Sequence, residues 1–142
     1  MNDRLLSDLH PILEPLAQQF LDNCKESGIS AFIDQTYRNE TDQNNDYAQG
    51  RTAPGRIITN AQYGQSPHNC VDSQGNPAAK AFDFAIQNVT GILDWDASDP
   101  EWQAAIKIGE ALGLVSGSCF HSIVDNPHFE LPNWQTKDSI SN

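Results

Sequence analysis

Residues 52–80, "TAPGRIITNAQYGQSPHNCVDSQGNPAAK", place the tightest constraint on how this chain can fold. The segment is rich in Gly, Pro, Asn and Ser, which favour turns and loops over helices and strands. Long ordered loops inside a compact domain are usually functional. The chain has 142 residues, a length that suits one domain with one core. We therefore expect a small fold whose regular elements support a site built largely from loops.

Hydrophobic periodicity predicts the regular elements on either side of this segment. Apolar residues recur at helical spacing in two stretches and alternate in three others. The predicted helices are residues 5–24 and 98–114, and the predicted strands are residues 29–38, 81–89 and the end of 122–131. Pro11 fits the first turn of a new helix, so we expect a break near His10. Ser98 or Asp99 is expected to cap the second helix.

The order of these elements predicts the fold class. Residues 39–51 allow two interpretations, a short helix from about Thr41 to Gly50 or a structured loop. The order of helix, strand, loops, strand, helix and strand indicates a small α+β domain with an antiparallel sheet and flanking helices. We expect residues 1–134 to form this single domain and residues 135–142 to be a polar, frayed C-terminal tail.

The charge balance of the chain limits its partners. It carries 8 basic and 19 acidic residues, for a net charge of −11 at pH 7. Nucleic-acid binding requires a basic face, and electrostatic attraction to anionic membranes or cell walls requires positive charge. We therefore expect no nucleic-acid partner and interpret the acidic excess as a solubility feature.

Three further features predict where the protein is made. The N-terminal segment "MNDRLLSDLHPILEPL" lacks the basic start and continuous apolar run of a signal peptide. No apolar stretch is long enough to span a bilayer. Cys24, Cys70 and Cys119 are widely spaced and form no disulfide framework, so we expect free thiols in a reducing compartment, although one pair can bridge. These features predict a cytoplasmic protein without membrane insertion, which we expect to be a monomer.

Two His and one Asp form a candidate metal site. His68 lies within the loop segment, Asp83 lies in a predicted strand and His128 begins the last strand. Such a set can hold zinc and leave a fourth position to water, whose pKa zinc lowers to about 7. Asp125 is then the candidate general base for that water. The spacing differs from the tight helical pair of H-E-x-x-H, so spacing alone does not establish the site.

Each of these residues also has a simpler interpretation. Asp83 lies between Phe82 and Phe84, and if both Phe side chains face the core, Asp83 faces outward as an ordinary surface residue. His68 can be a solvated loop residue. The Asp-Asn-Pro sequence at residues 125–127 is common in turns. These residues alone do not decide between the metal site and the simpler interpretations.

Several separate segments carry a family signature. It reads S-x-H-x-x-G-x-A-x-D, followed near the end by D-x-x-H or E-x-x-H. The matching residues are Ser66 and His68 in "SPH", Ala81 and Asp83 in "AKAFD", and Asp125 and His128 in "DNPH". Residues 36–69 and the segments "WQAAIKIGEALGL" and "SIVDNPHFEL" extend the match from Leu9 to Leu131. On these residues the chain resembles the zinc D-alanyl-D-alanine carboxypeptidases and dipeptidases, and most closely the phage endolysins that are L-alanyl-D-glutamate peptidases.

The resemblance implies a role for each signature residue. His68, Asp83 and His128 would hold Zn²⁺, and Asp125 would act as general base and later return a proton to the leaving amine. Asp in this position is typical of the endolysin branch, whereas the dipeptidase branch has Glu. The implied fold is the D-Ala-D-Ala peptidase-like α+β domain with a long, loop-rich zinc site.

Three more residues receive roles from the same resemblance. Arg38 matches the Arg that steadies the substrate carbonyl as it becomes an oxyanion, and such stabilisation is usually a large term in catalysis. The alternative is a surface Arg paired with Glu40 or Asp42. Ser66 would orient a ligand or the substrate. Gln43 would support either Arg38 or the loop.

The chain departs from the family pattern in three places. The signature places its Asp seven positions after its His, whereas Asp83 lies fifteen positions after His68, so this chain carries an insert beside the metal site. The signature Gly is replaced by Ala79, which requires a backbone that tolerates a side chain. The segment usually similar to W-G-G-D-W is replaced by "GLVSGSCFHSIVD", which places four residues where substrate-facing groups are expected: Ser116, Cys119, Phe120 and His121. Cys119 and His121 also allow adventitious metal binding.

The resemblance implies a bacteriolytic enzyme that hydrolyses the L-Ala–D-Glu bond of peptidoglycan stem peptides. As an endolysin it would accumulate in the host cytoplasm and reach the cell wall through a phage holin. Two alternatives remain: a carboxypeptidase that removes terminal D-Ala, and a non-catalytic, zinc-stabilised module that binds cell walls.

Overall fold

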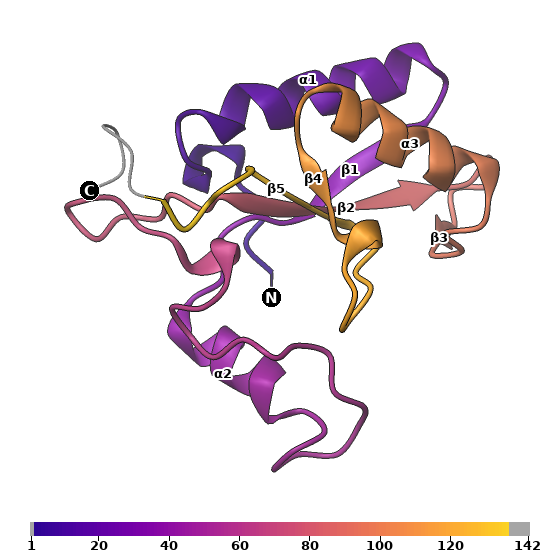
Figure 1. Cartoon of the computed structure of the whole chain (residues 1–142). Coiled ribbons are helices and arrows are strands. Elements are labelled where there is room, and N and C mark those ends of the chain that lie inside the picture. The colour runs from indigo at the N-terminus through magenta and orange to yellow at the C-terminus, as the bar shows by residue number, and fades with distance from the viewer. Residues whose placement is uncertain (1, 137–142) are drawn as a thin grey trace.

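The protein is an α+β domain in which a five-stranded sheet separates two helices from a loop-rich lobe (Figure 1). The computed structural model describes residues 2–136. Its α-helices are α1 (Leu13–Glu26), α2 (Glu40–Ala48) and α3 (Pro100–Ala111). Its strands are β1 (Ser30–Gln35), β2 (Ala81–Gln87), β3 (Leu93–Asp94), β4 (Val115–Ser116) and β5 (His128–Glu130). The predicted fold class is therefore confirmed. No helix in residues 2–136 is long and apolar enough to cross a membrane.

Every strand pair in the sheet is antiparallel, and β2 lies at its centre. The strand order is β1-β2-β5-β4, and β3 pairs with the far end of β2. In the β2–β5 pair Asp83 lies opposite His128, and in the β1–β2 pair it lies opposite Gln35. Pairing thus places two of the three candidate metal ligands side by side.

Side chains alternate along a strand, so β2 and β5 direct one set of side chains toward the core and another toward the lobe. Phe82, Phe84 and Phe129 point toward α1 and α3, where all three rings contact Phe20. These side chains belong to one buried core cluster. Asp83 points to the opposite face. The prediction that Asp83 faces away from the core is therefore correct, but this face of the sheet is covered by the lobe.

The helix ends differ in detail from the sequence predictions. The break near His10 is present, but α1 begins at Leu13 because Pro11 lies in the preceding turn. Residues 39–51 do contain a helix, and its N-cap is Asn39, whose side chain accepts from the backbone N of Asp42 at 2.9 Å. Asp99 is the N-cap of α3, although its side chain makes no capping hydrogen bond.

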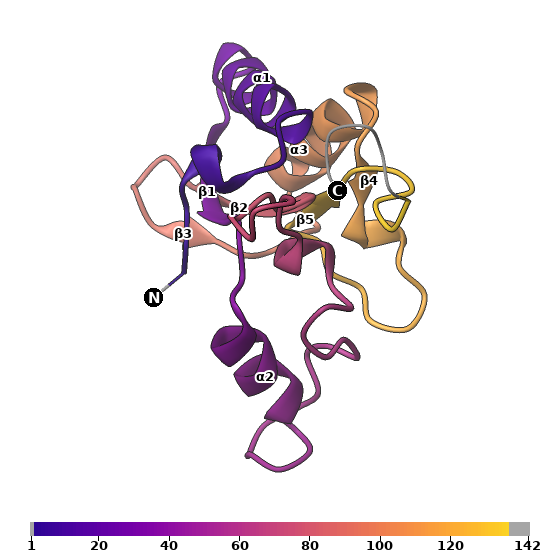
Figure 2. The ribbon, with the colours of Figure 1, turned by 90° about the vertical axis from the view of Figure 1, so that its left-hand side faces the viewer.

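The lobe consists of α2 and the loop that follows it, and it lies across the sheet from α1 and α3 (Figure 2). Figure 2 shows α2 and the loop that follows it on one side of the sheet, with α1 and α3 on the other. The loop returns to the sheet through a short 3-10 helix, Pro67–Asn69, which begins with a capping box between Ser66 and Asn69. The loop segment therefore delivers His68 to the lobe-facing side of the sheet.

The insert after His68 folds as a small closed turn. The backbone N of Ala78 donates to the carbonyl O of Cys70 at 2.9 Å, and Val71 bridges Pro77. At its tip, the Asp72 side chain accepts from the backbone N of Gln74 and of Asn76, both at 2.9 Å. The extra residues therefore leave and rejoin the chain at nearly the same place.

Candidate active site

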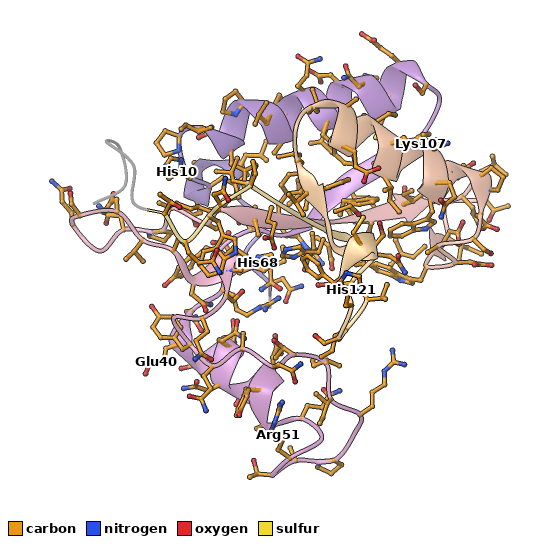
Figure 3. All side chains as sticks on the ribbon, viewed as in Figure 1. His10, Glu40, Arg51, His68, Lys107 and His121 are labelled. Atoms are coloured by element: carbon orange, nitrogen blue, oxygen red, sulfur yellow. The ribbon has the colours of Figure 1, made fainter. Side chains whose placement is uncertain are left out.

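His68, Asp83 and His128 converge on one point between the sheet and the lobe (Figure 3 labels His68). His68 Nε2 lies 3.4 Å from Asp83 Oδ1 and 3.2 Å from His128 Nδ1, and His128 Nδ1 lies 3.3 Å from Asp83 Oδ1. Ligands at about 2.0–2.1 Å from a tetrahedral metal ion lie about 3.3 Å from one another. Asp83 Oδ1 is buried and has no hydrogen-bond partner among the described residues. These three atoms therefore fit a tetrahedral metal ion.

The ring nitrogen of each His that points away from the cluster has its own partner. His68 Nδ1 donates to the backbone carbonyl O of Thr36 at 2.7 Å, which leaves Nε2 toward the cluster. His128 Nε2 lies 2.7 Å from Glu130 Oε1, which leaves Nδ1 toward the cluster. Such partners fix the tautomer and orientation of metal-binding His side chains. Glu130 was missed from the sequence, although a residue two positions after His128 on a strand must share its face.

The electrostatics of the cluster favour bound positive charge. Burial of Asp83 works to raise its pKa, but the nearby His68 and His128 rings outweigh it and hold that pKa well below its usual range. Burial of His128 works to lower its pKa, but the nearby carboxylates of Asp83 and Glu130 raise it to about 10. The cluster thus has a negative potential suited to a cation.

Asp125 lies at the edge of the cluster, on the loop before β5. Its Oδ2 is 3.7 Å from His128 Nδ1, and its side chain is 44% exposed. Burial, with a smaller contribution from the Asp83 charge, raises its pKa. Its backbone N donates to the carbonyl O of Gly117 at 2.9 Å, and a methyl group at Gly117 would overlap the carbonyl O of Asp125. A side chain at residue 117 would therefore displace this carboxylate.

Arg38 follows β1 and is held beside Asp83 by several groups. Its Nη2 donates to Gln35 Oε1 at 2.8 Å and lies 3.9 Å from Asp83 Oδ2. Its Nη1 donates to Gln43 Oε1 at 3.1 Å, and its Nε lies 3.3 Å from Asp46 Oδ2. The acidic partner is therefore Asp46 of α2, rather than Glu40 or Asp42, and the guanidinium faces the His-Asp-His cluster.

Gln43 and Ser66 are buried supports of this arrangement. Gln43 Nε2 donates to the carbonyl O of Ala61 at 2.7 Å, so the side chain joins Arg38 to the loop segment. Ser66 Oγ accepts from the backbone N of His68 at 3.2 Å and caps the 3-10 helix that carries this ligand. The structure thus places all the candidate site residues around one cluster.

Comparison with known proteins connects this geometry to a family. No family model matches the sequence. The peptidoglycan L-alanyl-D-glutamate endopeptidase CwlK of Bacillus subtilis (strain 168) is 33% identical over 135 residues, which cover 89% of this chain and 76% of CwlK. The chain belongs to the peptidoglycan L-alanyl-D-glutamate endopeptidase family. The L-Ala D-Glu endopeptidase ChiX of Serratia marcescens has a similar fold, with a TM-score of 0.58 at 16% identity, over 89% of this chain and 82% of ChiX. The predicted superfamily and its peptidase character are confirmed.

A cleft with a volume of about 500 Å³ lies above the cluster. Asp46, Asp125 and Glu130 line it together with Arg38 and the His-Asp-His cluster. Of the four residues expected to face substrate in the replaced segment, only Phe120 lines the cleft, where its ring lies 5.5 Å from that of His128. Ser116 is instead buried.

The other departures from the family pattern do not disturb the His-Asp-His cluster. Ala79 is fully buried, and its backbone φ is not positive, so the position does not require Gly. Cys119 is exposed and its Sγ lies 3.9 Å from Glu110 Oε2. Neither Cys119 nor His121 joins a group of three metal-binding side chains in residues 2–136. The cysteines are free thiols, as expected.

Proposed function

We propose that the protein is a zinc-dependent peptidase that hydrolyses the L-Ala–D-Glu bond of peptidoglycan stem peptides. The observation that carries this proposal is the combination in one cleft of a His-Asp-His cluster with a carboxylate and a guanidinium that are not needed to bind metal. The choice of the L-Ala–D-Glu bond as the one that is hydrolysed follows the names of the relatives CwlK and ChiX. A module that only binds cell walls would have no use for Asp125 and Arg38 beside the cluster.

The residues of the cleft would have three separate roles: metal binding, proton transfer and stabilisation of the oxyanion. His68, Asp83 and His128 would hold Zn²⁺, which when bound acts as a Lewis acid and lowers the pKa of water. The raised pKa of Asp125 suits it to take a proton from the attacking water and return it to the leaving amine. Arg38 directs Nη2 toward the cluster, where a guanidinium can stabilise the oxyanion of the tetrahedral intermediate.

We further propose that the protein acts as an endolysin of the phage type, as a monomer made in the host cytoplasm that reaches the wall with the help of a holin. The support for this proposal is the similarity of residues 36–69 to the endolysin branch. Expression in a bacterial host with and without a holin tests it. Lysis that depends on the holin is the expected result, and lysis without a holin would contradict the proposed route.

Mass spectrometry of digested peptidoglycan tests the proposed reaction. Zinc-loaded protein is expected to release fragments with new D-Glu amino termini, and a chelator is expected to abolish the release. Loss of terminal D-Ala alone would identify a carboxypeptidase instead. No cleavage of several wall chemotypes would favour the wall-binding module.

The variant Asp125→Asn tests the general base. We expect it to bind zinc as the wild type does and to lose at least about 10²-fold in kcat, because proton transfer by a positioned side chain contributes this much. Zinc content is measured by elemental analysis of the same samples that are assayed. Unchanged kcat in the zinc-loaded variant would refute the role of Asp125.

A further inference from the structure

The cleft continues past Asp125 into a second compartment. This compartment has a volume of about 430 Å³ and is lined by Arg56, Ile57 and Ile58 on the lobe side and by residues 122–125 on the other. The main cleft and the second compartment share four residues: Ile58, Ser122, Ile123 and Asp125. A ligand that extends through the cleft past Asp125 would therefore enter this compartment.

The walls of the compartment are aliphatic and exposed. Ile57, Ile58 and Val124 are 45%, 40% and 57% exposed; Ile57 and Ile58 come from the loop after α2, and Val124 from the loop before β5. Single exposed aliphatic residues are normal on protein surfaces, but several from separate segments that line one hollow indicate a binding site. The walls can therefore pack against methylene groups of a ligand.

The lobe-side wall is held in place by the end of α2. Gln49 Nε2 donates to the carbonyl O of Arg56 at 3.0 Å. A methyl group at Gly50 would lie 2.7 Å from the backbone N of Ile57, and one at Gly55 would lie 2.9 Å from Gln49 Cγ. Both glycines also have positive φ. The loop is therefore packed closely on the two residues that follow α2, which fixes the position of the Arg56 backbone.

Arg56 gives the compartment a positive charge. The chain has a net charge of −11, and Arg56 forms no ion pair with any residue in the part of the chain that the structure describes. Its charge is thus available to an anionic ligand. An aliphatic hollow with one free guanidinium matches a short aliphatic chain that ends in a carboxylate.

The proposed function indicates which part of the substrate this is. The residue that returns a proton to the leaving amine must lie beside the leaving residue, so the leaving residue lies on the Asp125 side of the cleft. A glutamyl residue within a peptide has two carboxyl groups, and only one takes part in the next peptide bond. Building on the proposed function, we propose that the compartment binds the glutamyl residue and that Arg56 pairs with its remaining carboxylate.

A pair of synthetic stem peptides tests this assignment. One contains L-Ala–D-Glu with the remaining carboxyl free, and the other carries a carboxamide at that carboxyl. We expect the wild type to cleave the carboxylate peptide with a kcat/KM about fivefold higher, mostly through KM, because an exposed ion pair contributes about 1 kcal/mol at most. Arg56→Gln is expected to bring the ratio near one, and Arg56→Lys to retain part of it.

Three controls establish that a change in this ratio comes from the Arg56 charge. Lys107→Gln removes an exposed charge on α3, away from the cleft (Figure 3), and should leave the ratio unchanged. Zinc content should be equal in all variants. Higher salt should reduce the preference of the wild type but not that of Arg56→Gln.

The possible outcomes distinguish this proposal from the one on which it rests. If the L-Ala–D-Glu bond is cleaved but Arg56→Gln keeps the ratio of the wild type, the compartment does not bind this carboxylate and the inference is wrong, while the proposed function stands. If zinc-loaded wild type cleaves neither peptide, the proposed function fails and the assignment of the compartment fails with it.

Discussion

The 2.7 Å contact between Glu130 Oε1 and His128 Nε2 predicts a large effect of Glu130 on metal affinity. The Glu130 side chain is only 14% exposed and that of His128 only 5%, so the hydrogen bond is largely shielded from water. A hydrogen bond to a charged group in such a place contributes about 1.5–3 kcal/mol. Because about 1.4 kcal/mol corresponds to a factor of ten, Glu130→Ala should weaken zinc binding about 10- to 100-fold.

Two substitutions separate the geometric and the electrostatic parts of this effect. Glu130→Ala leaves His128 Nε2 without its acceptor, so the ring can turn or change tautomer. Glu130→Gln keeps an acceptor oxygen but removes the negative charge, so we expect a smaller loss, about tenfold or less. Glu26→Ala and Glu26→Gln, at the exposed end of α1, are matched controls and should bind zinc as the wild type does.

Competition with a chromophoric chelator at constant pH measures the zinc affinity of each variant. The absorption spectrum of the cobalt-substituted protein gives a second measurement, because it reports the ligand geometry directly. If Glu130→Ala binds zinc as tightly as the wild type and changes only KM, Glu130 contacts substrate and the reasoning from its hydrogen bond to His128 is refuted.

Three further substitutions test other features of the structure. Gly109→Ala should lower the free energy of unfolding by about 1–3 kcal/mol in a denaturant titration, because the added methyl overlaps the buried Phe129 ring; an increase in stability would show that α3 can move away. A hydrogen bond with Asp3, and then burial, raises the pKa of Asp8 to about 6, so its contribution to stability is present below its unfolded pKa near 3.8 and is lost as the pH rises through about 6. Asp8→Asn should therefore raise Tm relative to the wild type at pH 7.5 but not at pH 3.5, and an equal difference at both values would contradict this. Arg38→Lys should keep zinc but lower kcat about 10²-fold in the peptide assay, since Lys cannot reproduce the arrangement of donors; normal kcat would exclude the oxyanion role.

The alternation of "AFDFAIQ" was sufficient to predict how Asp83 is presented. The Phe residues on either side bury toward the helices, so Asp83 must face the other way. What lies on that other face was not predictable from this strand. If nothing covered that face, Asp83 would be an ordinary surface residue. If His68 lay over that face, Asp83 could bind a metal together with it. Only the family signature, which joins residues far apart in the chain, decided between the two.

Other parts of the site have no distinct signal in the sequence. The acceptor of His68 Nδ1 is the backbone carbonyl of Thr36, and every residue has such a carbonyl. Asp46 reaches Arg38 only because α2 is oriented as it is. The helix α2 begins at Glu40, close to the expected start near Thr41, but the sequence did not identify its N-cap, Asn39.

The short strands were missed for a different reason. β3 and β4 each contain two residues, so neither can display a periodic pattern. They are defined by their partners β2 and β5, which means that tertiary structure determines them. The strands β1 and β2 and the helices α1 and α3 have enough residues to show their period, and the sequence predicted all four. It also predicted β5 at the end of residues 122–131, although that strand has only three residues.

The closed turn after His68 makes the distance along the chain between two ligands independent of their distance in space. The 2.9 Å hydrogen bond between Ala78 and Cys70 joins the two ends of the turn, so residues at its tip can be added without moving the cluster. Ser73 and Gln74, which are exposed at that tip, are therefore suitable places to insert a fluorescent label or a cell-wall-targeting peptide. The departure from the family spacing thus provides an attachment point for engineering close to the active site.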